Sequence, residues 1–211
     1  EAKEMNVVTP FEGIGASVRR KEDFRFIQGR GAYTDDADKP GQLHAWILRS
    51  PHAHARIKSI DISAAASMPG VVEIYTGADM AKDNVGGLPC GWQIHNKDGS
   101  PMAEPPHPVL AQDKVRHVGD PVAVAIAATR QQARDAAEAI AVDYEVLPAA
   151  ATMDAALKPG AAAIHDGVAG NLCYDWHIGD KAVVDAAFAN AAHVVKFDLV
   201  NNRLIPNAME P

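Results

Sequence analysis

Cysteine, long apolar runs and clustered basic residues are all scarce in this chain of 211 residues. The only two cysteines, Cys90 and Cys173, belong to no Cys-x-x-Cys pair and to no His/Cys grouping with zinc spacing. Two cysteines exclude a disulfide framework, and a reducing cytoplasm fits this usage best. The longest apolar run, Pro121 to Ala128, is far shorter than the roughly 20 residues that cross a bilayer. The sequence therefore predicts a cytoplasmic protein without a membrane span.

Charge argues against a nucleic-acid partner. The formal net charge is −7, and basic residues cluster only once, at Arg19-Arg20-Lys21. Phosphate binding needs a basic face or stripe, so this cluster is better interpreted as a solvated surface turn.

The N-terminus, Glu1 to Phe11, mixes charges and has no hydrophobic stretch, so it is not a secretory signal. With 47% hydrophobic and 22% charged residues, the composition is that of a folded protein with a packed core.

The pattern of apolar residues predicts an α+β fold. A helix is expected at 129–141, capped by Thr129 and burying a stripe of small side chains: Ala133, Ala136, Ala137 and Ile140. Together with the strands 122–127 and 142–147 it forms a strand, helix, strand block. A short helix between Asp61 and Met68, with Asp61 or Ser63 as its N-cap, should end at Pro69-Gly70. Further strands are expected at 43–48, 53–62 and 71–75, the last ending at Thr76-Gly77.

Two segments lack this periodicity. Residues 81–108 are rich in Gly and Pro and predict a long irregular segment, which we expect to pack against another subunit or against other domains. Residues 148–170 are rich in Ala, Pro and Gly and predict a surface linker, with a domain boundary near residue 165. Beyond it, a strand is expected at 171–177, a helix opened by Gly179-Asp180 at 181–190, and a strand at 192–201. The chain stops on Glu210-Pro211 with no capping or tail composition, which suggests a truncated product.

Few residues are candidates for chemistry. His52 and His54 lie two apart on an expected strand, so both imidazoles would share one face; a metal site there needs further ligands, and a polar strand face is the simpler reading. His117 and Asp120 form a possible pair, but no nucleophile elbow accompanies them. Residues 13–15 and 29–31 have Gly-x-Gly patterns that complete no nucleotide-binding motif, so turn glycines are expected. Arg203 and Glu210 are candidates only if the chain continues into a site. The residues alone assign no catalytic, cofactor-binding or metal-binding position.

Seven segments in a fixed order carry a family resemblance. They are Ile14 to Asp23, Gly29 to Asp36, Arg49 to Ala55, Pro69 to Val72, Thr76 to Asp79, Val115 to Ala123 and Val142 to Pro148. These segments resemble the N-terminal region of the large subunits of the xanthine oxidase, aldehyde oxidase and carbon monoxide dehydrogenase family. The resemblance covers nearly the whole chain.

The resemblance implies a domain organisation. Residues 1–13 would be an N-terminal extension and 14–150 an α/β-hammerhead domain, a mixed sheet with flanking helices. Residues 151–170 would be a linker, and 171–211 the truncated start of the first molybdenum-cofactor-binding domain.

The resemblance also implies an oxidoreductase. Large subunits of the family bind molybdenum on a molybdopterin cytosine dinucleotide, and a distant glutamate activates a metal-bound hydroxyl that attacks a small-molecule substrate. Electrons pass to an iron–sulfur subunit and an FAD subunit, and large subunits are expected to dimerise. The cofactor loops, that glutamate and the copper-binding cysteine of the carbon monoxide branch would all lie downstream of Pro211, so this chain alone should be inactive. Carbon monoxide, an aldehyde or an N-heterocycle remain alternative substrates.

Two other readings stay open. The chain could be a non-catalytic scaffold or interaction module of a multi-subunit complex. Alternatively, it could belong to a naturally split subunit whose cofactor domains are on a separate chain.

Overall fold

The computed structural model describes residues 13–16 and 20–201. The chain divides into two compact units, residues 1–40 with 199–211 and residues 41–198. In the first unit, α1 (Asp23–Phe26) is a single turn, and η1 (Thr34–Asp36) is a short 3-10 helix. The rings of Phe26 and Tyr33 pack at 5.3 Å between centroids, so a small local contact joins these two turns.

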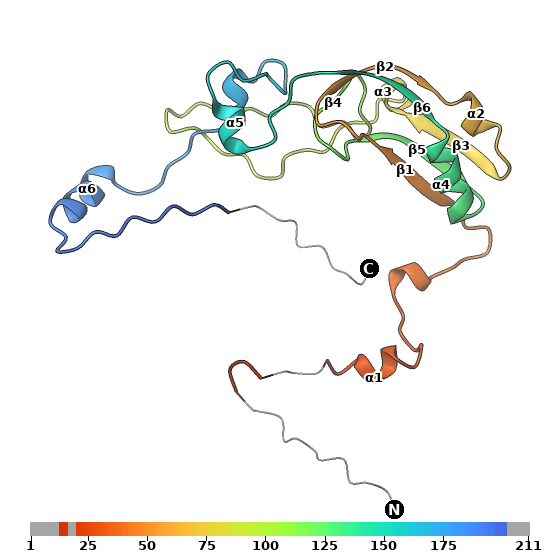
Figure 1. Ribbon diagram of the computed structural model, residues 1–211, viewed down its shortest axis with the longest axis horizontal. Coiled ribbons are helices and arrows are strands. Elements are labelled where there is room, and N and C mark those ends of the chain that lie inside the picture. Colours follow the sequence, from red (N-terminus) through yellow and green to blue (C-terminus); the bar gives the residue numbers. More distant parts are fainter. Residues whose placement is uncertain (1–12, 17–19, 202–211) are drawn as a thin grey trace, which may run out of the picture. The chain divides into compact units, whose positions relative to one another are not determined.

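The second unit contains two antiparallel sheets of three strands each (Figure 1). The strands of the first sheet, in spatial order, are β1 (His44–Arg49), β5 (Pro121–Ala127) and β3 (Val71–Thr76). In the second sheet the order is β4 (Lys114–Val115), β2 (Ala55–Asp61) and β6 (Ala141–Val146). The α+β class is confirmed, but the strands form two antiparallel sheets instead of the expected single mixed sheet.

The predicted block from β5 to β6 is confirmed as a strand, a helix and a strand. The helix α4 (Arg130–Glu138) begins at Thr129, whose side-chain oxygen accepts a hydrogen bond from the Gln132 N–H at 3.2 Å. β5 and β6 nevertheless belong to different sheets, because β5 pairs with β1 and β3 while β6 pairs with β2. The chain therefore passes from the first sheet to the second through α4, which packs against the first sheet.

Small side chains let α4 approach the first sheet closely. Ala133, Ala136 and Ala137 are buried, as predicted, and Ala136 and Ala137 pack with Ala123 and Ala125 of β5 in the main core. Ile140, also buried as predicted, follows the helix rather than lying in it. A second, smaller core joins the sheets around Ala55, Ala111, Val115 and Val122. The alanine stripe thus sets the spacing between helix and sheet.

A bulge in β2 explains its mixed periodicity. The pairing with β6 shifts register between Ile57 and Ser59, so Ile57 and Ile60, three residues apart, are both partly buried. A regular strand with a period of two could not place both on one face.

Besides α1 and η1, three further short elements before Lys158 were missed by the sequence pattern. The strand β3 is followed directly by α3 (Gly77–Lys82), where Asp79 accepts hydrogen bonds from the Thr76 N–H and hydroxyl at 2.8 and 2.7 Å. The two-residue strand β4 and the helix α5 (Met153–Leu157), which lies in the expected linker, also carried no clear signal. α2 (Ser63–Ala66) was predicted, but its N-cap is Ile62; Asp61 instead accepts the Ser63 N–H.

The C-terminal strands predicted at 171–177 and 192–201 are wrong. After η2 (Ala169–Asn171), residues 172–178 are extended without ladder pairing, and so are 193–201. The helix between them is confirmed as α6 (Lys181–Ala189), capped by the Asp180 carboxylate. The carbonyls of Cys173 and Asp175 accept backbone hydrogen bonds from the segment 81–108, but within the described residues neither predicted strand forms a ladder with another strand.

Candidate functional site

A cleft lies between the long segment 81–108 and the loop at 165–166. It has a volume of about 630 Å³. Its lining residues are Val85, Gly87, Leu88, Pro105, Pro106, His107, Pro108, Gln112, Asp113, Arg116, His165 and Asp166. Proline-rich backbone forms one wall, and polar side chains from the β4 region form the other.

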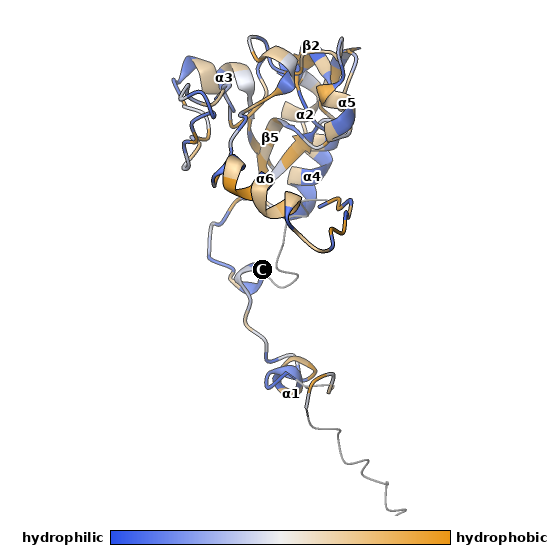
Figure 2. Ribbon diagram, turned by 90° about the vertical axis from the view of Figure 1, so that its left-hand side faces the viewer, coloured by the Kyte–Doolittle hydropathy of each residue, from blue (hydrophilic) through white to orange (hydrophobic). Residues whose placement is uncertain are grey.

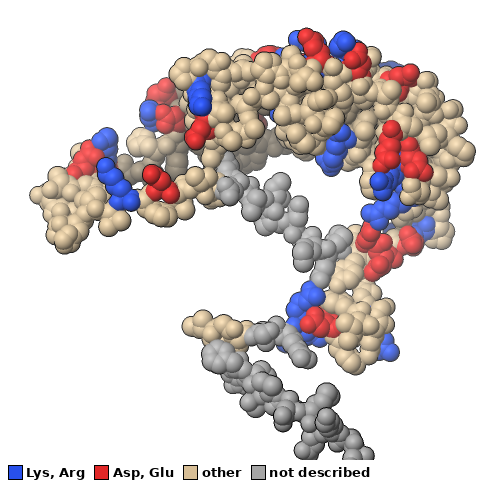
Figure 3. All heavy atoms as spheres, in the orientation of Figure 1, with Lys and Arg blue, Asp and Glu red and all other residues tan. Residues whose placement is uncertain are grey.

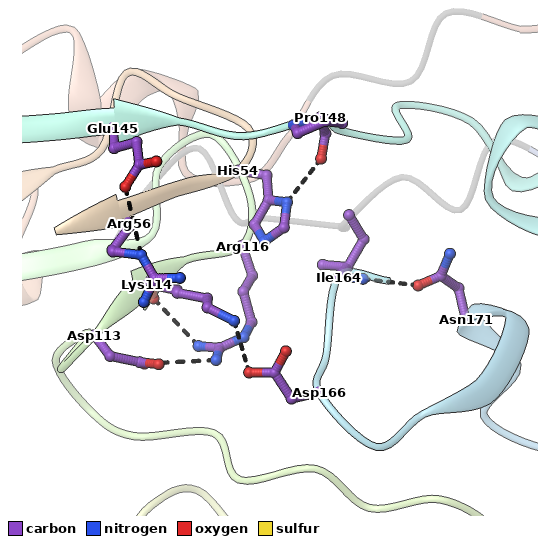
Figure 4. A network of polar contacts seen from close by, with 10 residues as sticks. All are labelled: His54, Arg56, Asp113, Lys114, Arg116, Glu145, Pro148, Ile164, Asp166 and Asn171. Carbon is purple, nitrogen blue, oxygen red and sulfur yellow. Dashed lines mark hydrogen bonds and ion pairs between the residues drawn. The ribbon is translucent and has the colours of Figure 1, made fainter. Parts of the chain in front are cut away.

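A polar network crosses this cleft (Figure 4). The Lys114 ammonium, on β4, donates to the Asp166 carboxylate at 2.6 Å. The Arg116 guanidinium donates to the Lys114 carbonyl at 3.2 Å and lies 3.5 Å from the Asp113 carboxylate. Hydrogen bonding from Lys114 lowers the pKa of Asp166. Each cation is thus paired with an aspartate, so the cleft has no excess charge that would select an anion.

His165 lines the same cleft, and its surroundings lower the pKa of its imidazole. Burial lowers its pKa, and the nearby Arg116, His107 and His54 lower it further. The Arg116 Nε and His54 Nε2 are buried and find no hydrogen-bond partner within the described part of the chain. The network ties the 165–166 loop to β4.

The predicted arrangement of His52 and His54 is wrong. Both precede β2, in a turn where the Ser50 hydroxyl donates to the His52 carbonyl and accepts the His52 N–H, each at 3.0 Å. His54 is buried, with Nδ1 2.7 Å from the Pro148 carbonyl, while His52 packs edge-on against Tyr144 at 5.0 Å. Each imidazole therefore has its own structural neighbour.

His117 and Asp120 form a turn. Their closest nitrogen and oxygen atoms are 3.8 Å apart, and the buried Asp120 carboxylate accepts the Arg116 N–H at 2.8 Å. Ser50 pairs with this turn through its backbone, which donates to the Asp120 carbonyl and accepts from Gly119. Because the Ser50 hydroxyl is already bonded to His52, the turn presents no activated nucleophile.

Asn171 is a structural residue that the sequence pattern did not reveal. Its backbone has φ of +54°, and its side-chain amide donates to the carbonyls of Ala156 and Ala162 at 3.0 and 2.9 Å. Its side-chain oxygen accepts the Ile164 N–H at 2.9 Å. One side chain therefore holds the turns between α5 and η2 together.

The long segment 81–108 is confirmed as irregular beyond the end of α3, but it is well ordered by hydrogen bonds. The Ala103 N–H donates to the Cys173 carbonyl and the Lys97 N–H to the Asp175 carbonyl, both at 2.8 Å. Lys97 and Asp175 also form an ion pair of 2.6 Å. The segment and residues 173–175 thus lie side by side as one unit.

The remaining candidates add no chemistry. Gly15 and Gly29 have positive φ and lie in turns, as predicted, and Gly13 has positive φ in a bend, but Gly31 has no positive φ and lies in no turn. Arg203 and Glu210 lie outside the described residues. Within residues 13–16 and 20–201, no three His, Cys, Asp or Glu side chains come together in a group that could hold a metal ion. Neither is any helix in those ranges long and apolar enough to cross a membrane.

Comparison with known proteins decides the family. The sequence model described as "Aldehyde oxidase and xanthine dehydrogenase, a/b hammerhead domain" matches residues 28–148, more than half of the chain. The chain belongs to this hammerhead family. The matched span contains the six strands of the described residues together with α2, α3 and α4, so the resemblance found in the sequence is confirmed.

Individual relatives agree with this assignment. The chain is 36% identical to the carbon monoxide dehydrogenase large chain of Afipia carboxidovorans, over 94% of this hammerhead chain and 25% of that protein. It is 37% identical to the nicotine 6-hydroxylase large subunit of Paenarthrobacter nicotinovorans, over 86% of this chain and 21% of that one. The hammerhead chain therefore spans about a quarter of the length of these curated relatives.

Solved structures show the same fold. Reconstituted carbon monoxide dehydrogenase from Oligotropha carboxidovorans superposes with a TM-score of 0.65 at 36% identity, covering 86% of the hammerhead chain and 23% of that structure. Quinoline 2-oxidoreductase from Pseudomonas putida 86 gives a TM-score of 0.57 at 42% identity, covering 73% and 19%. The relatives include enzymes for different substrates, so family membership does not select one.

Proposed function

We propose that this hammerhead chain is the N-terminal part of the large subunit of a molybdenum hydroxylase, which oxidises a small molecule with oxygen derived from water. The observation that carries this proposal is the match of the hammerhead family together with about 36% identity to a carbon monoxide dehydrogenase large chain. In this proposal residues 14–150 are the hammerhead domain, 151–170 the linker and 171–211 the start of the cofactor-binding domain.

The proposed cofactor is molybdenum on a molybdopterin cytosine dinucleotide, held downstream of this chain. When bound, the group supplies the oxidative chemistry. The described residues do not fit it: they bring together no group of metal ligands, and the cleft beside Arg116 has its charges internally paired. We therefore assign a scaffolding role to these residues in this proposal.

We further propose partners of the kind found in such complexes. Electrons would leave through an iron–sulfur subunit and an FAD subunit, the large subunits would dimerise, and the complex would reside in the cytoplasm. One relative is named as a subunit of a 6-hydroxypseudooxynicotine dehydrogenase complex, which supports a multi-subunit assembly.

Metal and pterin analysis of the full-length subunit tests this proposal. We expect about one molybdenum per large subunit, release of a cytosine nucleotide on acid hydrolysis, and oxidation of one of three substrates: carbon monoxide, an aldehyde or an N-heterocycle. The chain of 211 residues, purified in parallel, should hold no stoichiometric molybdenum. A full-length protein free of both molybdenum and pterin would refute the enzymatic reading and favour the scaffold.

A further inference from the structure

Four basic side chains from four separate segments lie around one part of the cleft. They are His54 in the turn before β2, His107 in the long segment 81–108, Arg116 directly after β4 and His165 in the loop before η2. We call these four residues the basic junction. Arg116, His107 and His54 each lower the pKa of His165, so all three lie within electrostatic reach of its imidazole. His107, Arg116 and His165 also line a second pocket, which has a volume of about 150 Å³.

The charge of the basic junction depends on pH. The guanidinium of Arg116 is positive throughout, and this side chain is only 18% exposed. An imidazole gains positive charge in mildly acidic solution. His54 is buried and its Nδ1 faces the Pro148 carbonyl at 2.7 Å, so a proton added at Nε2 would find no acceptor within the described residues. Acid therefore adds like charge beside a cation that is already largely buried.

The other charged groups around the junction do not cancel this repulsion. They are Arg56 on β2, Asp113, Lys114, His117 and Asp120 in and around β4, and Asp166 in the loop. Asp120 raises the pKa of His165, but burial and the basic groups outweigh it. Asp113 and Asp166 are 60% and 72% exposed, so water screens their charges. On the face seen in Figure 3, acidic and basic side chains are interspersed over residues 41–198, so no broad field of one sign adds to this local balance.

The loop that carries His165 is weakly attached. Within residues 151–171, which include α5 and η2, no residue is buried, and Met153 and Leu157 are more than half exposed. The α5 helix carries hydrophobic as well as hydrophilic residues (Figure 2). In the described part of the chain, the contact of Lys114 with Asp166 is the one hydrogen bond that links this loop to a strand (Figure 4). Little buried surface would therefore be lost if the loop moved away from β4.

The opposite wall of the cleft is held more firmly. The His107 carbonyl accepts the Leu88 N–H at 2.8 Å, and a methyl group added at Gly87 would lie 2.5 Å from the same carbonyl oxygen. The segment also donates backbone hydrogen bonds to the carbonyls of Cys173 and Asp175. Repulsion within the junction therefore acts mainly on the loop.

We propose that the loop formed by residues 151–171 is a pH-sensitive latch, which protonation of His165 and His107 beside Arg116 releases from β4 while the two sheets stay folded. An open loop exposes His165 to water, where an imidazole has a pKa of about 6.5, whereas the closed cleft lowers that pKa. Protons therefore bind the open form more strongly. The closed form is favoured above about pH 6.5, and this preference is lost as the pH falls through the lower pKa of the closed form.

The ion pair of Lys114 with Asp166 does not itself cause the release. Hydrogen bonding from Lys114 lowers the pKa of Asp166, so this carboxylate stays charged over the pH interval in which imidazoles titrate. The pair instead opposes release, and the repulsion within the junction has to exceed it. The latch depends on neither molybdenum nor a substrate.

Hydroxyl-radical footprinting of the full-length protein at pH 7.5 and pH 5.5, read by mass spectrometry, tests the latch. The side chains of Lys114 and Arg116, which are 11% and 18% exposed, report on the cleft. Both should be oxidised about threefold or more faster at pH 5.5, while Ile74 in the main core, which is 4% exposed, should stay protected. Equal rates for Lys114 and Arg116 at the two pH values would overturn the proposal. A parallel rise at Ile74 would overturn it in favour of general acid unfolding.

Substitutions at His165 separate the junction from other effects of acid. His165→Gln removes the titrating ring and should abolish most of the increase at pH 5.5. His165→Lys introduces a group that is positively charged at both pH values and should open the cleft already at pH 7.5. His177→Gln makes the glutamine substitution at an exposed histidine outside the cleft and should leave the increase intact. An undiminished increase in His165→Gln would assign the opening to other groups and contradict the latch.

Discussion

Replacing Gly77 with alanine should destabilise this chain through a single backbone contact. Gly77 is the first residue of α3 and is buried. A methyl group added there would overlap the carbonyl oxygen of Ala111 and lie 2.7 Å from its carbonyl carbon and 3.0 Å from Cα of Gln112. All three atoms belong to backbone, so no side-chain rotation can relieve the overlap. The connection into β4 or the start of α3 has to move instead.

The size of the effect follows from two opposing contributions. Alanine has a helix propensity up to about 1 kcal/mol better than glycine, and it also restricts the unfolded chain. Forcing an additional methyl group into a packed site typically costs about 1 to 3 kcal/mol. Because this contact involves backbone and lies well inside the van der Waals distance, we expect the steric cost to win. The net loss should be about 1 to 2 kcal/mol in the free energy of unfolding.

Gly86 provides a matched control. It lies in the exposed segment after α3, where an added methyl group meets nothing within 4 Å and φ is outside the left-handed range. Gly86→Ala should therefore be neutral or stabilise the chain by up to about 1 kcal/mol through the unfolded state. The same chemical change is thus expected to have opposite signs at two glycines nine residues apart.

Urea unfolding followed by circular dichroism measures both variants. The midpoint should fall for Gly77→Ala with little change in the slope of the free energy against urea, and it should stay level or rise for Gly86→Ala. Equal midpoints for Gly77→Ala and the unchanged chain would refute the close approach of α3 to residues 111 and 112.

Three further perturbations test the cap, the loop and the cleft. Thr129→Ala removes the acceptor of the Gln132 N–H and should lower the free energy of unfolding by about 1 kcal/mol in urea titrations, whereas Thr129→Ser should retain most of it. Asn171→Ala removes three hydrogen bonds at a residue with positive φ, so we expect proteolysis between α5 and η2 to accelerate; an unchanged cleavage rate would contradict its role. Because burial and Arg116 lower the pKa of His165, the folded state disfavours its charged form, and stability is lost as pH falls below about 6.5 through the lower folded pKa. His165→Gln should reduce that loss in urea midpoints measured from pH 7 to pH 5, and an identical pH profile would refute it.

Local sequence patterns predicted secondary structure correctly where the structure depends on residues close together in the chain. Thr129, the alanine stripe after it and the apolar strands on either side predicted β5, α4 and β6 closely, because capping and helical periodicity act over a few residues. The ordered motifs also identified the family, because they describe the same elements in the same order.

Other features were decided only by tertiary contacts. Nothing in the residues of β5 and β6 says that they join different sheets, because hydrogen-bond partners are chosen across the chain. The bulge between Ile57 and Ser59 likewise exists because β2 pairs with β6 in a shifted register. The cleft beside Arg116 likewise depends on a long-range contact, because Lys114 pairs with Asp166, which lies 52 positions further along the chain.

The C-terminal third of the chain also contains both features that local sequence determined and features that depended on tertiary contacts. Its sequence by itself determined α6, because Asp180 caps the helix locally, and it determined the apolar character of residues 172–200. It did not determine strands, because a strand depends on hydrogen bonds to a neighbour, and within the described residues these segments have no strand to pair with. Local sequence specified what each segment could become, and only the tertiary partners decided which of these structures formed.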